Sequence, residues 1–108
     1  MATTYKVLGQ SNPAAATDTT LYTVPALTET VVSTISITNL GTTGTFRIAV
    51  RPAGASIANQ HYLVYDATLN ANDSITLTLG VTLGTTDVIT VYASTNTLAF
   101  NVYGSEIA

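Results

Sequence analysis

Residues 73–83, with the sequence DSITLTLGVTL, show the clearest alternation of apolar and polar positions in the chain. Every second position is aliphatic, and these positions are Ile75, Leu77, Leu79, Val81 and Leu83. A period of two is typical of a β-strand with one buried face. A register slip of one residue would expose all five side chains and cost about 7 to 15 kcal/mol, taking about 1.5 to 3 kcal/mol for each. We therefore expect the other strands to supply an opposing apolar layer, in a sandwich or a closed barrel.

Further segments have the alternation or the composition of strands, and turn residues separate them. They are residues 3–8, 20–24, 30–40, 45–51, 61–69, 88–94 and 98–103. About eight short strands at this spacing predict an all-β fold, namely an antiparallel β-sandwich. The pattern alone leaves both a jelly-roll and an immunoglobulin-like topology open. With 108 residues, the chain has the length of a single domain, which we expect to span residues 1–108.

The segment at residues 30–40 is the second strong strand. Its buried face is expected to carry three branched aliphatic residues, Val31, Ile35 and Ile37. Ser33 interrupts this apolar row. Residues 39–44, NLGTTG, tolerate positive φ and predict a hairpin connection to the next strand. Residues 52–60, PAGASIANQ, have no sustained period and predict a loop whose length suits a crossing between two sheets.

The chain carries few charges. Charged residues make up 8% of it, against about 25% in ordinary soluble domains, and threonine alone makes up roughly a fifth. Isolated β proteins commonly protect their edge strands with lysine or other charges, but this chain has one lysine and two arginines. Two interpretations follow. Either neighbouring subunits cover the edges, which predicts a homo-oligomer, or short edge strands and proline-bearing loops protect them.

The sign of the charge excludes several partners. The formal net charge is −3, and the only cations are Lys6, Arg47 and Arg51. No basic stripe exists that could bind nucleic acid directly or an anionic membrane surface. Without cysteine, neither a disulfide framework nor a thiolate metal site can form. We see no signal-peptide pattern or transmembrane segment, so we expect synthesis in a cytoplasm.

Candidate catalytic and metal-binding residues are sparse. His61 is the only histidine, and a hydrolytic triad would need partners such as Ser56 and Asp66. On a strand, Asp66 would lie about 16 Å from His61 and on the opposite face. Asp66, Asp73 and Asp87 lie near strand ends, where they suit turn capping or, as an alternative, a calcium ion. We therefore predict no enzyme and no cofactor, and leave calcium open.

Arginines and tyrosines supply the candidate interface residues. Arg47 and Arg51 alternate with the apolar positions of residues 45–51, so they share one outer face. Tyr62 and Tyr92 fall on outer faces as well, and Tyr103 is grouped with them. Tyrosine is favoured at protein interfaces. Packing at the edge of the core, subunit contact and carbohydrate stacking all remain open for these tyrosines.

Three phrases and the opening of the chain resemble small virion structural proteins of tailed bacteriophages. The phrases are RPAGASIANQHYLVYD, NANDSITLTLGVTLGTTDVITVYAS and LAFNVYGSEI, and the opening is MATTYKVLGQ. The resemblance covers most of the chain and consists of strand and turn residues, so no functional residue carries over. It implies a non-enzymatic building block, present in many copies in the virion after synthesis in the host cytoplasm. Its partners would be the major capsid protein or other virion proteins.

Within this class, we expect a capsid decoration or cement subunit that stabilises the particle through edge pairing and apolar contacts. Arg47 and Arg51 are then the residues expected to contact an acidic partner surface. A neck or tail component is the first alternative. A receptor-binding module that recognises host glycans through exposed tyrosines is the second, and an enzyme is the least supported.

Overall fold

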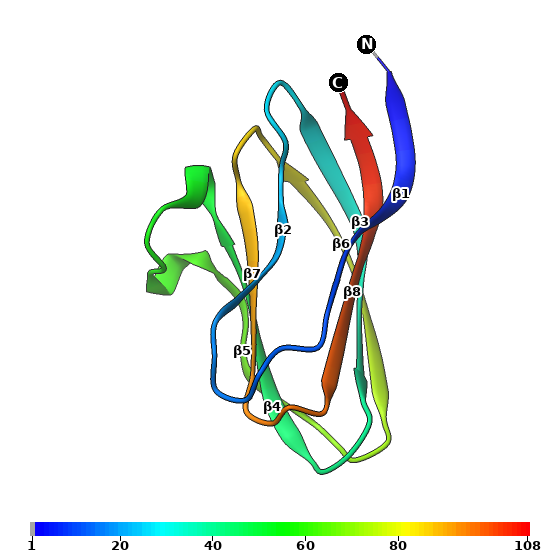
Figure 1. Cartoon of the computed structure of the whole chain (residues 1–108), viewed down its shortest axis with the longest axis vertical. Helices are drawn as coiled ribbons and strands as arrows, with labels where there is room; N and C mark the ends of the chain where they lie inside the picture. Colours follow the sequence, from blue (N-terminus) through cyan, green and yellow to red (C-terminus); the bar gives the residue numbers. More distant parts are fainter. Residues whose placement is uncertain (1) are drawn as a thin grey trace.

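Eight antiparallel strands form two four-stranded sheets that pack face to face in the computed structural model, which describes residues 2–108 (Figure 1). The strands are β1 (Thr3–Ser11), β2 (Thr19–Thr23), β3 (Glu29–Asn39), β4 (Gly44–Arg51), β5 (Tyr62–Leu69), β6 (Ser74–Leu83), β7 (Val88–Ala93) and β8 (Leu98–Ile107). Two short 3-10 turns, η1 (Pro52–Gly54) and η2 (Asn59–His61), lie between β4 and β5. The predicted all-β sandwich of about eight strands is confirmed. Among the described residues, no helix is long and apolar enough to span a membrane.

The strand order identifies a jelly roll. Sheet A has the order β1-β8-β3-β6, and sheet B has the order β2-β7-β4-β5. The first strand therefore pairs with the last, the second with the seventh, the third with the sixth and the fourth with the fifth. This is the pairing of one long hairpin rolled up into two Greek keys. It decides between the two topologies that the sequence left open.

Both predicted connections were wrong. Residues 39–44 join β3 of sheet A to β4 of sheet B, and residues 52–60 join β4 to its neighbour β5 within sheet B. The side-chain amide of Asn39 binds the carbonyl oxygens of Thr42 and Leu69, which turns residues 39–44 into a corner between the sheets. Arg51 binds residues 54 and 55, which holds the longer loop against its own sheet. Loop length and turn composition did not reveal these side-chain contacts.

The centre of the core lies between the middle strands of the two sheets. Its largest fully buried apolar side chains are Phe46, Phe100, Ile35, Ile37, Ile48, Ile89 and Leu98. The rings of Phe46 and Phe100 meet edge to face with their centroids 6.3 Å apart. These residues come from β3, β4, β7 and β8, so the interior strands organise the fold.

The strand with the clearest alternation, β6, is an edge strand. Ile75 and Leu79 are 38% and 37% exposed, Leu77 and Val81 are half-buried, and only Leu83 is buried. The expectation that all five side chains line the core was therefore wrong. At an edge, the opposing sheet covers the strand only in part, although the alternation of the sequence is the same as in a central strand.

A row of β-bulges crosses sheet A. Leu8 in β1, Ser33 in β3 and Leu79 with Gly80 in β6 are extra residues in the ladders, and all lie level with Tyr103 and Gly104 of the regular strand β8. Each extra residue shifts the inward and outward alternation of its strand.

The bulge at Ser33 corrects one predicted face. Ile35 and Ile37 are buried as expected, but on the other side of the bulge Val32 is buried and Val31 is exposed. Placing Val31 on the buried face was therefore wrong. The polar interruption at Ser33 marks the position where the alternation shifts.

All four edge strands contain a bulge. Besides those in β1 and β6, the ladders place one at Leu21 in β2 and two in β5, at Leu63 and at Tyr65 with Asp66. Bulges twist an edge away from regular pairing and so hinder the addition of a further strand. The edges thus have a protection that the low content of charged residues did not reveal.

Candidate functional site

The outer face of sheet B carries an arginine stacked between two tyrosines. The guanidinium carbon of Arg47 in β4 lies 4.3 Å from the ring centroid of Tyr65 and 4.0 Å from that of Tyr92. Its Nε donates a 2.6 Å hydrogen bond to Asp66 Oδ1, and its Nη2 donates a 3.3 Å bond to Oδ2. These contacts combine cation–π stacking with a bidentate ion pair. The hydrogen bond to Asp66 raises the pKa of Arg47, so the group stays charged.

The bulge in β5 builds this arrangement. Phe46 pairs with Ala67 and Ile48 with Val64, so both Tyr65 and Asp66 lie opposite the single residue Arg47. Asp66 adopts a positive φ of 52° to do so. One strand thereby supplies a ring for stacking and a carboxylate for pairing at adjacent positions. We call Arg47, Tyr62, Tyr65, Asp66 and Tyr92 the Arg47 cluster.

Tyr62 extends this cluster toward the loop between β4 and β5. Its ring meets that of Tyr65 edge to face, with the centroids 4.8 Å apart. Together with Asn59, the two rings line a hollow of about 300 Å³. Aromatic faces beside an amide can receive an apolar side chain of a protein partner or stack on a sugar ring. Tyr62 and Tyr92 thus lie on an outer face, as predicted.

Arg51 has a different setting from Arg47. Its Nε donates a 3.0 Å hydrogen bond to Thr90 Oγ1, and its Nη1 donates bonds of 3.3 and 3.0 Å to the carbonyl oxygens of Gly54 and Ala55. The two arginines share the outer face of sheet B, but Arg51 fastens a loop. Contact of either residue with an acidic partner stays a prediction.

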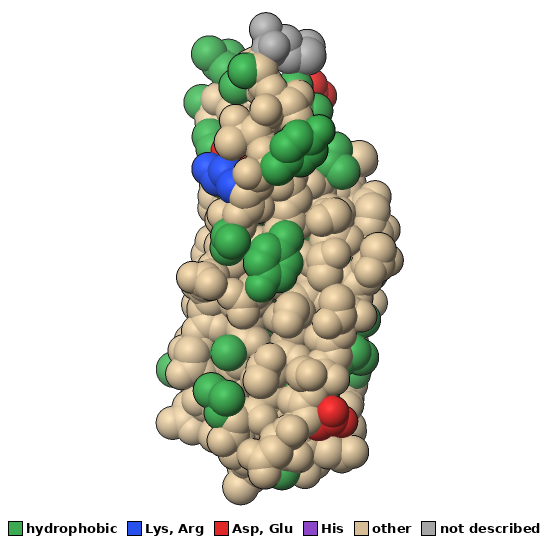
Figure 2. Space-filling model, turned by 90° about the vertical axis from the view of Figure 1, so that its right-hand side faces the viewer, with side chains coloured by type: hydrophobic (Ala, Val, Ile, Leu, Met, Phe, Trp, Pro, Cys, Tyr) green, Lys and Arg blue, Asp and Glu red, His purple; other side chains and the backbone are tan. Residues whose placement is uncertain are grey.

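Tyr103 lies on the opposite side of the molecule, on the outer face of sheet A, so the structure does not bring all the candidate interface residues together. There it joins three apolar residues that the sequence analysis did not propose as interface residues, namely Tyr5, Val7 and Val31. Tyr5 and Val7 are 84% and 48% exposed. The sequence contained a signal for Tyr5 and Val7, because they alternate with Lys6 along the first strand and so share one face of it. Figure 2 shows this side with scattered apolar groups, while a basic side chain and acidic side chains are visible near its edges.

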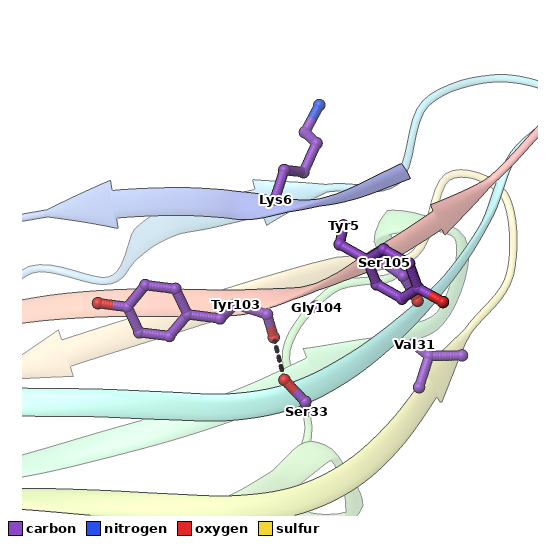
Figure 3. Close-up of a pocket in the computed structure, with 7 residues that line it drawn as sticks. All are labelled: Tyr5, Lys6, Val31, Ser33, Tyr103, Gly104 and Ser105. Carbon is purple, nitrogen blue, oxygen red and sulfur yellow. Dashed lines mark hydrogen bonds between the residues drawn. The ribbon is translucent and has the colours of Figure 1, made fainter. Parts of the chain in front are cut away.

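A hollow of about 330 Å³ lies beside Tyr5 on this face. In Figure 3, the rings of Tyr5 and Tyr103 lie along it, Val31 and Ser33 approach from β3, and Lys6 points away to the other side of β1. Ser33 Oγ donates a 3.2 Å hydrogen bond to the Tyr103 carbonyl oxygen. We call this feature the Tyr5 hollow. It lies on the row of bulges, so the same irregularity shapes both the sheet and the hollow.

A polar network lies on the inner side of the same part of sheet A. The Tyr22 hydroxyl donates a 2.6 Å hydrogen bond to Glu106 Oε2, and Lys6 Nζ lies 3.0 Å from Glu106 Oε1. Burial and the bond to Glu106 raise the pKa of Tyr22 to about 12. The bonds from Tyr22 and Lys6 lower the pKa of Glu106. Lys6 is therefore paired with Glu106 at the edge of the sheet, although its side chain remains 45% exposed.

The residues considered for catalysis or calcium have structural contacts. His61 Nδ1 accepts a 3.1 Å hydrogen bond from the Ala58 amide, which closes the turn η2. Asp66 pairs with the arginine described above, while Asp73 and Asp87 accept 2.8 Å bonds from backbone amides of their own turns. Within residues 2–108, no group of three or more histidine, cysteine, aspartate or glutamate side chains could hold a metal ion. The calcium alternative gains no support from these positions.

Comparison with known proteins adds no family to this description. The chain matches no protein-family model, no curated protein and no solved structure. The two outer faces of the sandwich are therefore the features from which a function can be inferred.

Proposed function

We propose that this protein is a non-enzymatic structural subunit of a tailed-bacteriophage virion, made in the host cytoplasm and incorporated as a capsid decoration or cement protein. The observation that carries the proposal is the display of aromatic and aliphatic side chains on both outer faces. Tyr5 and Val7 are exposed on sheet A, and Tyr65 is exposed on sheet B. These exposed aromatic and aliphatic side chains are the groups through which such a subunit would contact other virion proteins.

Two further points support this role. The sequence resembles small virion proteins in its strand and turn phrases, and viral capsid domains are among the proteins that use the jelly roll. Lectins and cupins use the same architecture, so the fold contributes an analogy only. The partners in this proposal are the major capsid protein or other virion proteins, together with further copies of the chain.

We assign attachment to the particle to the Arg47 cluster and the adjacent Arg51. Tyrosine and arginine are the residue types most enriched at the energetically dominant positions of interfaces. Here the stacking of Arg47 between Tyr65 and Tyr92 fixes both rings before any partner binds. A fixed side chain loses little rotamer entropy on binding. The cluster therefore offers a rigid surface of aromatic edges with a neutralised charge pair at its centre.

Electron microscopy of particles labelled with an antibody against this chain tests the role. We expect gold label distributed over the head of the virion and detection of the chain by mass spectrometry of purified particles. Label confined to the neck or tail would replace the decoration role with the alternative of a neck or tail component. Absence of the chain by both methods would overturn the virion proposal.

A glycan-binding module is the second candidate, because Asn59, Tyr62 and Tyr65 line a hollow suited to a sugar ring. A glycan array with the wild-type chain and the Tyr65→Ala variant tests it, and Tyr103→Ala on the other face is the matched control. Binding lost only in Tyr65→Ala would favour receptor recognition. Binding to no glycan is the result expected of a cement subunit.

A further inference from the structure

The outer face of sheet A is a grid of uncharged side chains set by the strand registers. One row holds Tyr5, Ser105, Val31 and Thr82, the next holds Val7, Tyr103, Thr34 and Thr78, the third holds Gln10, Asn101, Ser36 and Thr76, and the last holds Ala99, Thr38 and Ser74. None of these residues carries a charge at pH 7. We call this grid the uncharged face; in Figure 2, most of this side of the molecule carries no charged side chain, and the charged groups lie near its edges.

The charged groups nearest to the uncharged face lie at its ends or behind it. Glu29 begins β3, two positions before Val31, and Asp73 directly precedes β6. Lys6 points to the other side of β1 and pairs with Glu106 (Figure 3). A molecule that covers the middle of this face therefore has no ionic group to desolvate, and it needs no complementary charge of its own.

From these observations we propose that the uncharged face is the surface through which two copies of this chain dock face to face, about a two-fold axis. A second copy fits the chemistry of the face because the face is complementary to itself. Hydroxyl and side-chain amide groups both donate and accept hydrogen bonds, so threonine, serine, asparagine and glutamine can pair with the same residue types across a two-fold axis. The four rows themselves contribute no like charges to the contact, although each copy has a net charge of −3 and Glu29 lies just beyond the row of Tyr5 and Val31.

The apolar end of the face supplies a knob and a hollow side by side. Tyr5 is the knob, because its side chain is 84% exposed. The Tyr5 hollow lies beside it and is lined also by Lys6, whose side chain points away (Figure 3), and by Val31, Ser33, Tyr103, Gly104 and Ser105. In a two-fold contact, Tyr5 of each copy enters the hollow of the other, so the same pair of features is used twice.

The dimensions and the geometry of the face suit such a contact. Four strands about 4.8 Å apart, over eight residues of about 3.3 Å each, give a flat area of about 500 Å². Two such faces would bury about 1,000 Å² in total, which is at the lower end of the range for specific interfaces. Two twisted sheets pack face to face with their strands inclined by about 30°, as the two sheets of one sandwich do. A second jelly roll is therefore a suitable partner for this sheet.

Sedimentation of the purified, untagged chain tests the proposal. We expect a concentration-dependent dimer at micromolar concentration, with a dissociation constant that does not rise between about 0.05 and 0.5 M NaCl, because the centre of the contact contains no ion pairs. Val31→Asp places a charge beside the Tyr5 hollow, at the apolar end of the contact, and should weaken dimerisation at least about tenfold. Leu63→Asp, at an exposed apolar position of β5, is the matched control and should leave the dimer unchanged.

Thr78→Arg provides a second variant in case Val31→Asp does not fold. Thr78 is exposed on the edge strand β6, so its replacement disturbs no packing, yet an arginine there places a charge in the contact. Circular dichroism and thermal unfolding establish that each variant is folded. We expect Thr78→Arg to weaken the dimer as well. A dimer unaffected by both variants, or one broken by Leu63→Asp, would overturn the assignment of this face.

A monomeric wild type at 100 μM would overturn the proposal outright. Titration with cellohexaose, a neutral oligosaccharide, distinguishes the other class of ligand suited to hydroxyl groups and tyrosines. Binding of cellohexaose to a monomer, lost in Val31→Asp, would replace the second copy with a glycan. The biological role of the dimer rests on the proposed function in the virion, but different experiments test the two proposals. A monomer found on virions contradicts only the dimer, whereas a dimer absent from virions contradicts only the virion role.

Discussion

The Tyr22 hydroxyl in sheet B donates a 2.6 Å hydrogen bond to Glu106 Oε2 in sheet A, so a polar contact joins the two sheets near one end of the sandwich. Tyr22 is only 7% exposed, and its hydroxyl also lies 2.8 Å from Thr30 Oγ1. Lys6 Nζ holds the other carboxylate oxygen at 3.0 Å. Each polar atom of this network therefore has a partner at the point where the apolar core ends.

Removal of the Tyr22 hydroxyl should destabilise the fold. Tyr22→Phe keeps the ring but removes the donor to Glu106, and a hydrogen bond to a charged group contributes about 1.5 to 3 kcal/mol. We expect a loss of that size in the free energy of unfolding, measured by urea denaturation. Tyr5→Phe removes a hydroxyl from an exposed ring and serves as the control. Equal stabilities of wild type and Tyr22→Phe would contradict the role of the network.

The same network predicts how stability depends on pH. The pKa of Glu106 in the folded state lies below its usual value of 4.5, so its ionisation stabilises the fold above that pH. This contribution is lost as the pH falls through the folded pKa. Stability measured by urea denaturation between about pH 5 and pH 3 should therefore fall less in Glu106→Gln than in wild type. Identical acid slopes for the two proteins would exclude Glu106 as a source of the effect.

Tyr22 makes the stability of the fold depend on pH at the alkaline end of the range. Its pKa is raised from 10.0 to about 12, so the neutral hydroxyl contributes stability that is fully present below pH 10 and is lost as the pH rises through 12. We expect the urea midpoint of the wild type to fall over this range. Tyr22→Phe should start lower and lose less, because it has no hydroxyl to ionise at that position. A variant with the same alkaline loss as the wild type would contradict this prediction.

The sequence predicted the class of the fold because alternation and turn residues mark strands locally. It did not predict which strands lie in the centre, because β6 alternates as regularly at an edge as a central strand would. The sequence also contained signals for two of the bulges, although they were not interpreted as such. Ser33 was noted only as a polar interruption of a strand, and Gly80 lies within an apolar alternation. A polar residue or a glycine at such a position often marks a bulge.

The candidate interface residues were predictable as a set of residue types, but not as a spatial arrangement. Arg47 and Arg51 do share a face, as the alternation of residues 45–51 indicates. Their contacts differ because the bulge in β5 brings Tyr65 and Asp66 to Arg47, whereas the loop after β4 folds back onto Arg51. Neither the bulge nor the direction of the loop follows from the spacing of the two arginines.

Alanine substitutions at two glycines distinguish the cost of a steric overlap from the cost of a left-handed backbone conformation. A Cβ on Gly104 would overlap the carbonyl oxygen of Val31 and lie 3.0 Å from the Cα of Val32, so β3 and β8 would have to separate. Gly80 has a φ of 62° with nothing within 4 Å of a built Cβ. We expect Gly104→Ala to cost about 3 kcal/mol or more. Gly80→Ala should cost about 1 to 2 kcal/mol, from the left-handed backbone alone.

Urea denaturation of the two alanine variants measures this difference. The two glycines lie on the same row of bulges in sheet A, so the two variants differ mainly in the space around the added Cβ atom. A cost at Gly104 no larger than that at Gly80 would show that the two strands can separate locally without loss of stability.

Arg51→Ala should loosen the loop between β4 and β5 with little effect elsewhere. Arg51 Nη1 bonds the carbonyl oxygens of Gly54 and Ala55, and its Nε bonds the buried residue Thr90. Amide hydrogen exchange should become faster in residues 52–61 and stay unchanged in the core of sheet A. Arg47→Ala is the control, because its side chain contacts β5 and β7 but not this loop. Equal exchange in wild type and Arg51→Ala would contradict the fastening role.

Asn39 is the buried polar residue whose loss should affect the corner between the sheets most strongly. Its side chain is 1% exposed, and its amide nitrogen donates to the carbonyl oxygens of Thr42 and Leu69 at 2.8 and 3.0 Å. Its carbonyl oxygen accepts from the Gly41 amide at 3.0 Å and from Thr97 Oγ1 at 2.9 Å. One side chain thereby joins the end of β3 to three other parts of the chain.

Replacement of this side chain leaves several polar groups without partners in a site that water reaches poorly. We expect Asn39→Ala to lower the free energy of unfolding by about 2 to 4 kcal/mol, since each buried group left unsatisfied costs about 1 to 3 kcal/mol. Asn101→Ala is the matched control, because Asn101 makes one exposed bond, of 2.7 Å, to Gln10. That variant should lose less than about 1 kcal/mol, as is usual for exposed positions. Equal losses at the two positions, measured by urea denaturation, would mean that the corner between β3 and β4 holds without Asn39.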